Sequence, residues 1–195
     1  MEKIVTDLVN LLKDVAASEP WIISFCFGFL LIITESIIPA LPLSVFITIN
    51  VVIFGPVIGY IMSYIATICG CLLSYTVFKK GFSKYLYRNL DKHPRTKKIV
   101  KAIEKISFSN LVVLTAIPFT PAFSINIGAG LTKMPFKKFL SMLIISKAVM
   151  VYFWAFVGST FVESVNDVSV LIKLVVVLII TFIISKVVIK HFNVE

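Results

Sequence analysis

The chain has 195 residues, 58% of them hydrophobic, with a mean hydropathy of +1.00 and a net charge of +9. A soluble domain of this size has no need for so much apolar surface, so the composition indicates an all-α membrane protein with several transmembrane helices. The positive charge does not indicate nucleic-acid binding, because cations that flank apolar segments are typical of membrane proteins facing an anionic leaflet. The three cysteines lack metal-ligand spacing, and we expect no metal and no cofactor.

The first 19 residues predict a helix that lies on the membrane surface. Apolar residues repeat at Ile4, Leu8 and Leu11, and polar residues occupy the opposite helical face. A first transmembrane helix is then expected over about residues 21–38, beginning at Trp21, an aromatic residue suited to the membrane interface.

A lone carboxylate and two prolines mark the end of this helix. Glu35 is the only charged residue in a run of 58 positions. A carboxylate in hydrocarbon is costly unless it is paired, hydrated or protonated. Pro39 and Pro42 remove backbone donors, and broken backbone at membrane depth persists only where protein buries it or where it lines a watery cavity. The sequence therefore predicts a re-entrant hairpin over residues 39–54 that carries a polar site.

The proline pattern occurs twice. Three prolines of the first half recur in the second half at one constant offset: Pro39 with Pro118, Pro42 with Pro121, and Pro56 with Pro135. Three coincidences among eight prolines indicate a degenerate internal repeat, and weak internal symmetry is typical of transporter folds. We therefore expect a second hairpin in the second half.

A basic segment separates the two halves. Residues 79–106 contain ten Lys or Arg, and an apolar stripe through Val100 and Ile103 predicts a second amphipathic interfacial helix. We expect residues 79–105 to contact the anionic inner leaflet. Before this segment, small residues recur every three or four positions and predict close helix packing.

The chain is thus expected to form four transmembrane helices and two re-entrant hairpins in an inverted repeat. The two later transmembrane helices are expected at about 135–161 and 168–189. The predicted division is an interfacial helix at 1–19, a membrane domain at 20–162 with halves 21–81 and 107–162 joined by the basic segment 82–106, and a C-terminal helix and tail at 163–195.

The positive-inside rule favours this arrangement over one in which each hairpin crosses the membrane. With hairpins, both termini and the basic segment face the cytoplasm, and the turn on the far side, from Glu163 to Asp167, has no Lys or Arg. Full crossings would place Lys3, Lys13 and the lysines at 133–138 outside. The rule therefore predicts cytoplasmic termini and hairpins that enter from opposite sides.

Two charged residues fall inside predicted transmembrane helices. Glu35 lies about 21 Å from the helix start at Trp21, and Lys147 lies about 18 Å from Pro135, at about 1.5 Å per residue. We hypothesise that these two residues pair or share a hydrated cavity between the hairpin tips, because intramembrane ionisable groups are usually functional. The alternative is a static buried ion pair.

The second hairpin offers uncharged polar groups beside broken backbone. Backbone N–H groups freed near its prolines are suited to an anionic head group. The alternative is that the prolines and glycines only shape the turn. With Glu35, Lys147, Pro39 and Pro42, the predicted transport and substrate-binding residues are Thr115, Pro118, Thr120, Pro121, Asn126 and Gly130.

We do not expect an enzyme. The sequence has no G-x-S-x-G, no H-E-x-x-H, no phosphate-binding loop and no paired carboxylates on a helix. His93 and His191 are isolated, so they do not indicate a metal site.

Several short motifs occur in order along the chain. Glu35-Ser36 is followed by PALP, by G-P-x-x-G-Y ending at Tyr60, and by FKKG ending at Gly81. In the second half, P-F-T-P precedes Asn126, Ala129-Gly130-Leu131 and Phe139. Over about residues 20–162 this series resembles the DedA superfamily, also called the VTT or SNARE-associated-domain family. Its second half is most similar to the Tvp-like branch.

The resemblance implies paired re-entrant hairpins that meet at the membrane midplane and movement of lipids between leaflets. It implies that Glu35 is the family's membrane-embedded acid. DedA proper carries R-F-x-P-x-x-R in the second hairpin, whereas Thr115 and Pro121 occupy the two arginine positions here. This departure puts undecaprenyl phosphate itself in question as the substrate, and Lys147 is a candidate for the missing cation.

The residues and the resemblance together predict a lipid translocase, a flippase or scramblase, in the plasma membrane of a bacterium. Its substrate would be a phospholipid or undecaprenyl phosphate, and Glu35 would be its proton- or cation-responsive group. Two alternatives remain, a proton-coupled transporter of small solutes and a non-transporting membrane scaffold. A groove open sideways to lipid favours the first reading, a closed central vestibule the second, and no polar cavity at Glu35 the third. The sequence leaves open whether the protein forms a homo-oligomer.

Overall fold

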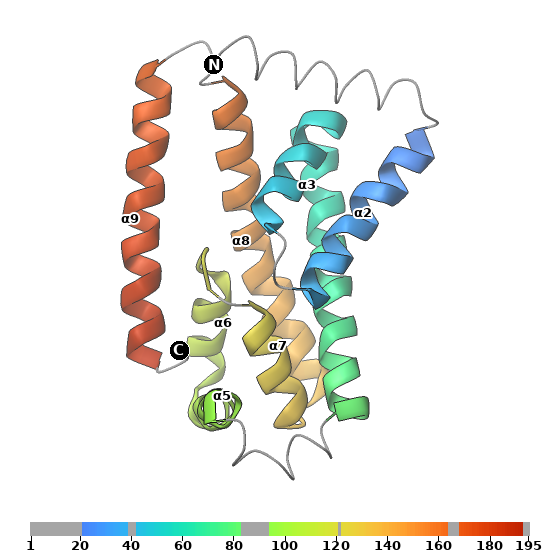
Figure 1. Cartoon of the computed structure of the whole chain (residues 1–195), viewed down its shortest axis with the longest axis vertical. Coiled ribbons are helices and arrows are strands. Elements are labelled where there is room, and N and C mark those ends of the chain that lie inside the picture. Colours follow the sequence, from blue (N-terminus) through green and yellow to red (C-terminus); the bar gives the residue numbers. More distant parts are fainter. Residues whose placement is uncertain (1–20, 39–41, 83–93, 121, 164–167, 193–195) are drawn as a thin grey trace.

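The structure is a computed structural model that describes residues 21–38, 42–82, 94–120, 122–163 and 168–192. These residues form helices and their connections, without a β-strand (Figure 1). The predicted helix at 1–19 and the prolines Pro39 and Pro121 lie outside the described residues. The elements are α2 (Trp21–Ile37), α3 (Leu43–Val77), the short π-helix η1 (Phe78–Phe82), α5 (Pro94–Lys105), α6 (Phe108–Ala116), α7 (Ala122–Leu131), α8 (Phe136–Glu163) and α9 (Val168–Phe192).

The number of membrane-crossing helices differs from the prediction. Among the described residues, three helices are long and apolar enough to cross a membrane: α3 with η1, α8 and α9. The segment expected as a first transmembrane helix, α2, has only 17 residues. At 1.5 Å per residue it spans about 26 Å, which is shorter than a hydrocarbon core of about 30 Å. The predicted count of four is therefore not confirmed.

The first hairpin is built from different segments than the sequence suggested. Gly55 interrupts α3 with φ 79° and ψ 167°, a conformation that essentially only glycine adopts, and Pro56 starts the continuation. The chain reverses there, so α3 consists of a first segment (residues 43–54) and a second segment (residues 56–77). Figure 1 shows the first segment returning beside α2 to the end from which α2 started. The hairpin limbs are therefore α2 and the first segment, rather than residues 39–54 alone.

Small residues allow these three segments to pack closely, as the sequence predicted. A methyl group added to Gly28 would lie 2.3 Å from the Asn50 side chain. One added to Gly59 would lie 2.5 Å from the Asn50 carbonyl oxygen, and one added to Gly70 would lie 2.5 Å from the Ser36 hydroxyl. The side chain of Asn50 also donates a 3.1 Å hydrogen bond to Ser63 across the Gly55 reversal. The hairpin thus packs tightly on the second segment of α3.

The second hairpin, formed by α6 and α7, repeats the first. Ser107 caps α6 by accepting a hydrogen bond from the Asn110 backbone N–H at 3.2 Å. The helix boundaries keep the offset of the prolines, because α2 ends at Ile37 and α6 at Ala116, while α3 begins at Leu43 and α7 at Ala122. In Figure 1 the two hairpins enter from opposite ends of the molecule, and their tips approach each other near its middle. The internal repeat is therefore present in the structure and is inverted.

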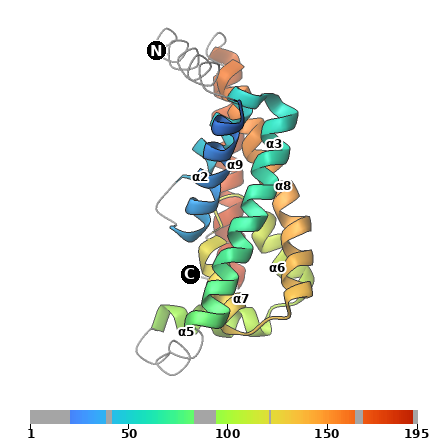
Figure 2. The ribbon, with the colours of Figure 1, turned by 90° about the vertical axis from the view of Figure 1, so that its right-hand side faces the viewer.

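The two ends of the described chain lie at opposite ends of the bundle. Helix α5 crosses the lower end in Figure 1, with Val100 and Ile103 buried, and the C-terminal end of α9 points toward the same end. Both views place the start of α2, at Trp21, at the other end (Figure 2). The prediction that both termini share the basic side is not confirmed. The reason is that the described residues contain three helices long enough to cross a membrane, and an odd number of such helices places the two ends of the chain on opposite sides.

The buried core has two parts, one in each half of the molecule. One cluster lies around α5, α6, α7 and the first half of α8, and includes Tyr75 stacked on Phe139 at 4.4 Å between ring centroids. The other joins α2, both segments of α3 and the second half of α8, with Ile32 and Ile47 fully buried. The outer faces of α3, α8 and α9 expose many large apolar side chains, as expected for helices that face lipid.

Candidate functional site: a polar cavity between the two hairpins

A small cavity lies where the two hairpins meet the two long helices. It measures about 10 Å³ in the space open to the centre of a water molecule, which is room for about one water. Side chains reach it from α2, both segments of α3, α7 and α8, so no single helix forms it. The lining residues are Glu35, Ser36, Leu43, Thr67, Cys71, Phe123, Asn126 and Lys147.

Two opposite charges face this cavity. The Lys147 side chain is completely buried (0% exposed), and its Nζ lies 3.5 Å from the Met150 sulfur, a weak acceptor. The Glu35 carboxylate is half-buried and interacts electrostatically with the Lys147 ammonium, although no direct salt bridge joins them. A buried ammonium without a strong acceptor is costly. The pair is therefore separated by space that a water or a polar group of a ligand is suited to occupy.

Asn126 adds an uncharged polar group to the same cavity. Its side chain is 1% exposed, and neither its Nδ2 nor its Oδ1 has a hydrogen-bond partner among the described residues. Leaving a buried amide unpaired costs about 1–3 kcal/mol, and native proteins rarely leave one without an explanation. An amide that can both donate and accept is suited to a water or a ligand between Glu35 and Lys147.

The other predicted site residues do not line the cavity. Thr115 is buried, and its hydroxyl donates to the Leu111 carbonyl within α6 at 2.7 Å. Pro118 accepts a hydrogen bond from Ser185 of α9 through its carbonyl, and the buried Thr120 hydroxyl has no partner among the described residues.

The glycine and prolines have packing or boundary positions. A methyl group on Gly130 would lie 2.9 Å from the Tyr75 carbonyl oxygen, so Gly130 permits the close approach of α7 and α3. Pro42 is exposed and immediately precedes α3, while Pro39 and Pro121 lie outside the described residues.

Sequence reasoning missed several lining residues on α3. Thr67 and Cys71 directly follow Ala66 and Gly70, two members of the stripe of small residues that the sequence assigned to helix packing. The Thr67 hydroxyl donates to the Ser63 carbonyl at 2.7 Å, so its oxygen can still accept a hydrogen bond from the cavity. The stripe of small residues was the sequence signal for these positions, because small side chains that allow close helix packing also leave space beside the buried Lys147.

Two tyrosines hold the part of α8 that carries Lys147. The Tyr64 hydroxyl donates to the Ile144 carbonyl at 2.8 Å, and the Tyr60 hydroxyl donates to the Ala148 carbonyl at 3.2 Å. The two rings stack with centroids 6.0 Å apart. These contacts fix the helical turn on either side of Lys147 against α3.

The fold and the cavity define a helical membrane protein built around two opposed hairpins. The family profile of the VTT domain matches residues 41–160, which is more than half of the chain. A Bacillus subtilis protein described as "Uncharacterized membrane protein YhjE" is 30% identical over 129 residues, which cover 66% of this chain and 62% of that protein. No solved structure gives a significant match. The chain therefore belongs to the VTT-domain, or DedA, family.

The region matched by the family profile does not include the whole site. The family profile begins after Glu35 and ends before α9, so both lie outside it. The aligned part also spans less than two thirds of the Bacillus protein. Neither match assigns the chain to the Tvp-like branch.

Proposed function

We propose that this protein moves a phosphate-bearing lipid, either a phospholipid or a polyprenyl phosphate, between the leaflets of a bacterial plasma membrane. The observation that carries the proposal is the central cavity, where Glu35, Lys147 and the unpartnered Asn126 amide meet between two opposed hairpins. An ammonium and an amide are suited to a phosphate, and a nearby carboxylate is suited to expel it or to exchange a proton. Family membership supports lipid transport as the activity.

In this proposal the two hairpins are re-entrant. Each begins and ends at its own side of the membrane, and the tips meet at the midplane. The end that carries α5 faces the cytoplasm, because basic residues gather there, among them Lys97, Lys101 and Lys105. The start of α2 then faces the opposite side. No covalent chemistry is needed, since the lipid is unchanged by the crossing.

The cavity is too small for a phosphate head group in this conformation. At about 10 Å³ it admits about one water, so the proposal requires the hairpins to separate and open a path to lipid. The enclosed shape also supports the rival reading, a proton-coupled transporter of a small solute. In that reading the same carboxylate would carry the proton, and no lipid would move.

The test is lipid translocation in liposomes that contain the purified protein. Phosphatidylethanolamine or polyprenyl phosphate with a fluorescent label on its tail is placed in both leaflets, and an impermeant quencher is added outside. We expect the wild type to expose inner-leaflet label quickly and Glu35→Gln to slow this at least about tenfold, since removing one charged hydrogen-bonding group costs about 1.5–3 kcal/mol.

Glu104→Gln is the matched control, because Glu104 is an exposed acid on α5, away from the cavity. It should translocate like the wild type. If the wild type moves neither lipid, lipid translocation is ruled out. A proton flux that Glu35→Gln abolishes in the same liposomes would then establish the solute-transport alternative.

A further inference from the structure

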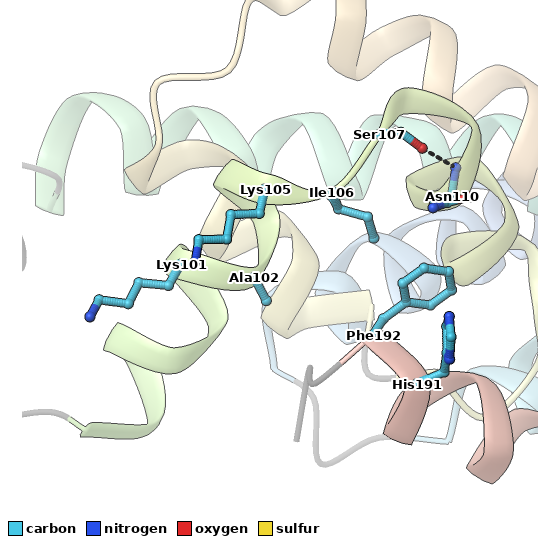
Figure 3. Close-up of a pocket in the computed structure, with 8 residues that line it drawn as sticks. All are labelled: Lys101, Ala102, Lys105, Ile106, Ser107, Asn110, His191 and Phe192. Atoms are coloured by element: carbon cyan, nitrogen blue, oxygen red, sulfur yellow. Dashed lines mark hydrogen bonds between the residues drawn. The ribbon is translucent and has the colours of Figure 1, made fainter.

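A second pocket lies at the basic end of the molecule, far from the central cavity. It has a volume of about 520 Å³ and is open to the outside. It forms where the joint between α5 and α6 faces the C-terminal end of α9, as Figure 3 shows. The lining residues are Lys101, Ala102, Lys105, Ile106, Ser107, Asn110, His191 and Phe192.

Every polar side chain that lines this pocket can donate a hydrogen bond. Lys101 and Lys105 supply ammonium groups, His191 supplies a ring N–H, and Asn110 supplies an amide N–H. None of the described residues that line it is acidic. The Ser107 oxygen already accepts from the Asn110 backbone, which leaves its hydroxyl hydrogen available to a ligand. This set of groups is suited to an anion with several acceptor oxygens, such as a phosphate.

The remaining surface of the pocket is apolar. Ala102, Ile106 and Phe192 form this part, and all three pack on the buried cluster beneath. A free phosphate would gain nothing from these side chains. A phospholipid would gain from both parts, because its phosphate reaches the cations while its glycerol and first methylene groups cover the apolar surface.

The side chains surround the pocket and leave it open. In Figure 3, His191 and Phe192 of α9 lie next to Asn110, whereas the side chains of Lys105 and Lys101 extend toward the other end of the pocket. A lysine side chain has a flexible four-carbon stem, so both lysines can turn toward a bound anion without any backbone movement. The pocket thus combines an apolar side with two cations on flexible stems, which suits a head group that arrives from the membrane surface.

We propose that this pocket binds the head group of an anionic phospholipid of the surrounding leaflet and thereby ties α9 to α5 and α6. The site is separate from the central cavity, and it does not depend on whether the protein translocates lipid. Bound lipid would bridge two segments that are far apart in sequence, and it would add to the buried cluster beneath the pocket, which contains Ile189 of α9 together with Ile103 and Leu111. The ligand class is a phosphodiester with a net negative charge and attached acyl chains.

The test measures binding of short-chain lipids to the full-length protein in detergent by native mass spectrometry. The probes are dioctanoyl phosphatidylglycerol, dioctanoyl phosphatidylcholine and glycerol phosphate. We expect the phosphatidylglycerol to bind at least about tenfold more tightly than either of the others. The double variant Lys101→Gln/Lys105→Gln should weaken it about tenfold, the effect of losing one or two charge-assisted hydrogen bonds.

The matched control is Lys137→Gln/Lys138→Gln, which removes two exposed lysines from the start of α8 at the same end, outside the pocket. It should change binding less than about twofold. An equal loss in both double variants would overturn the proposal in favour of diffuse charge attraction. Equal binding of phosphatidylcholine would reduce the pocket to an apolar groove, and equal binding of glycerol phosphate would identify a soluble anion as the ligand; either result overturns it.

Discussion

The two hairpins share one plan, yet only the first carries a charge. At the constant offset of the repeat, the counterpart of Glu35 is Leu114, which is completely buried. The counterpart of Lys147, on the long helix that follows the second hairpin, is Ile68 on α3. The two halves therefore share the order of their helices, but their charged residues lie at positions that do not correspond. A single carboxylate from one half faces a single ammonium from the other across the shared cavity.

The hairpins also differ in how their tips are held. The tip of the second hairpin includes Phe119, which has a positive φ of 66° and whose ring contacts Trp154 and Phe182 at centroid distances of 5.1 and 5.6 Å. The neighbouring Pro118 carbonyl accepts a hydrogen bond from Ser185 of α9. Helix α9 thus anchors the second tip from outside the matched family region. The first hairpin therefore supplies the charged residue, Glu35, whereas the tip of the second hairpin is held in place by contacts with α8 and α9.

The largest effect is expected from Lys147→Met. This change leaves the Glu35 carboxylate facing the cavity without its counter-charge, but it also removes a buried ammonium that has no strong acceptor. We expect no measurable translocation, and a loss of thermal stability in detergent smaller than the cost of about 3–5 kcal/mol for a directly bonded buried pair, because no salt bridge joins the two groups and Glu35 is half-buried. The double variant Glu35→Gln/Lys147→Met should be more stable than Lys147→Met alone. If the effects of the two changes on stability are additive, the two charges do not interact, and their placement in different halves of the molecule has no electrostatic role.

A smaller effect on transport, with the opposite effect on stability, is expected from Asn126→Leu. The leucine has a similar volume and removes two unpaired polar atoms, so stability should be unchanged or higher. Translocation should fall about tenfold, the equivalent of about one lost hydrogen bond to a ligand or water.

Thr115→Val is the comparison within the same hairpin. Thr115 is equally buried, but its hydroxyl bonds within α6 and does not line the cavity. It should leave translocation unchanged in the liposome assay. A loss of transport in Thr115→Val as large as in Asn126→Leu would mean that the whole hairpin, and not the cavity, is sensitive.

The smallest effect is expected from Ser185→Ala, which removes the hydrogen bond to the tip of the second hairpin. Stability should fall by about 1 kcal/mol, and amide hydrogen exchange should increase around Phe119 rather than around Glu35. Thr181→Val, which removes an internal hydrogen bond one turn earlier in α9, is the control. Equal exchange in both variants would show that α9 does not anchor this tip.

Much of this protein could be read from the sequence, because the signals are local. Apolar composition indicates a membrane protein wherever it occurs, and prolines end helices whatever surrounds them. The repeated prolines therefore predicted an internal repeat and the start of the long helical segments near Pro56 and Pro135. Helical rise, with both helices assumed to start on one side, placed Glu35 and Lys147 at similar depth. In the structure α2 and α8 start at opposite ends of the bundle (Figure 1), and the two residues line one cavity.

Only the tertiary structure decided which segments pack together and what completes the cavity. Gly55 and Pro56 mark the break in α3 locally, but no local pattern shows which groups of other segments Gly28, Gly59 and Gly70 approach. This packing makes α2 a limb of the hairpin, and among the described residues three helices rather than four are long and apolar enough to cross a membrane. It also left the Asn126 amide without a partner beside Lys147, since a polar group becomes unpaired only through what surrounds it.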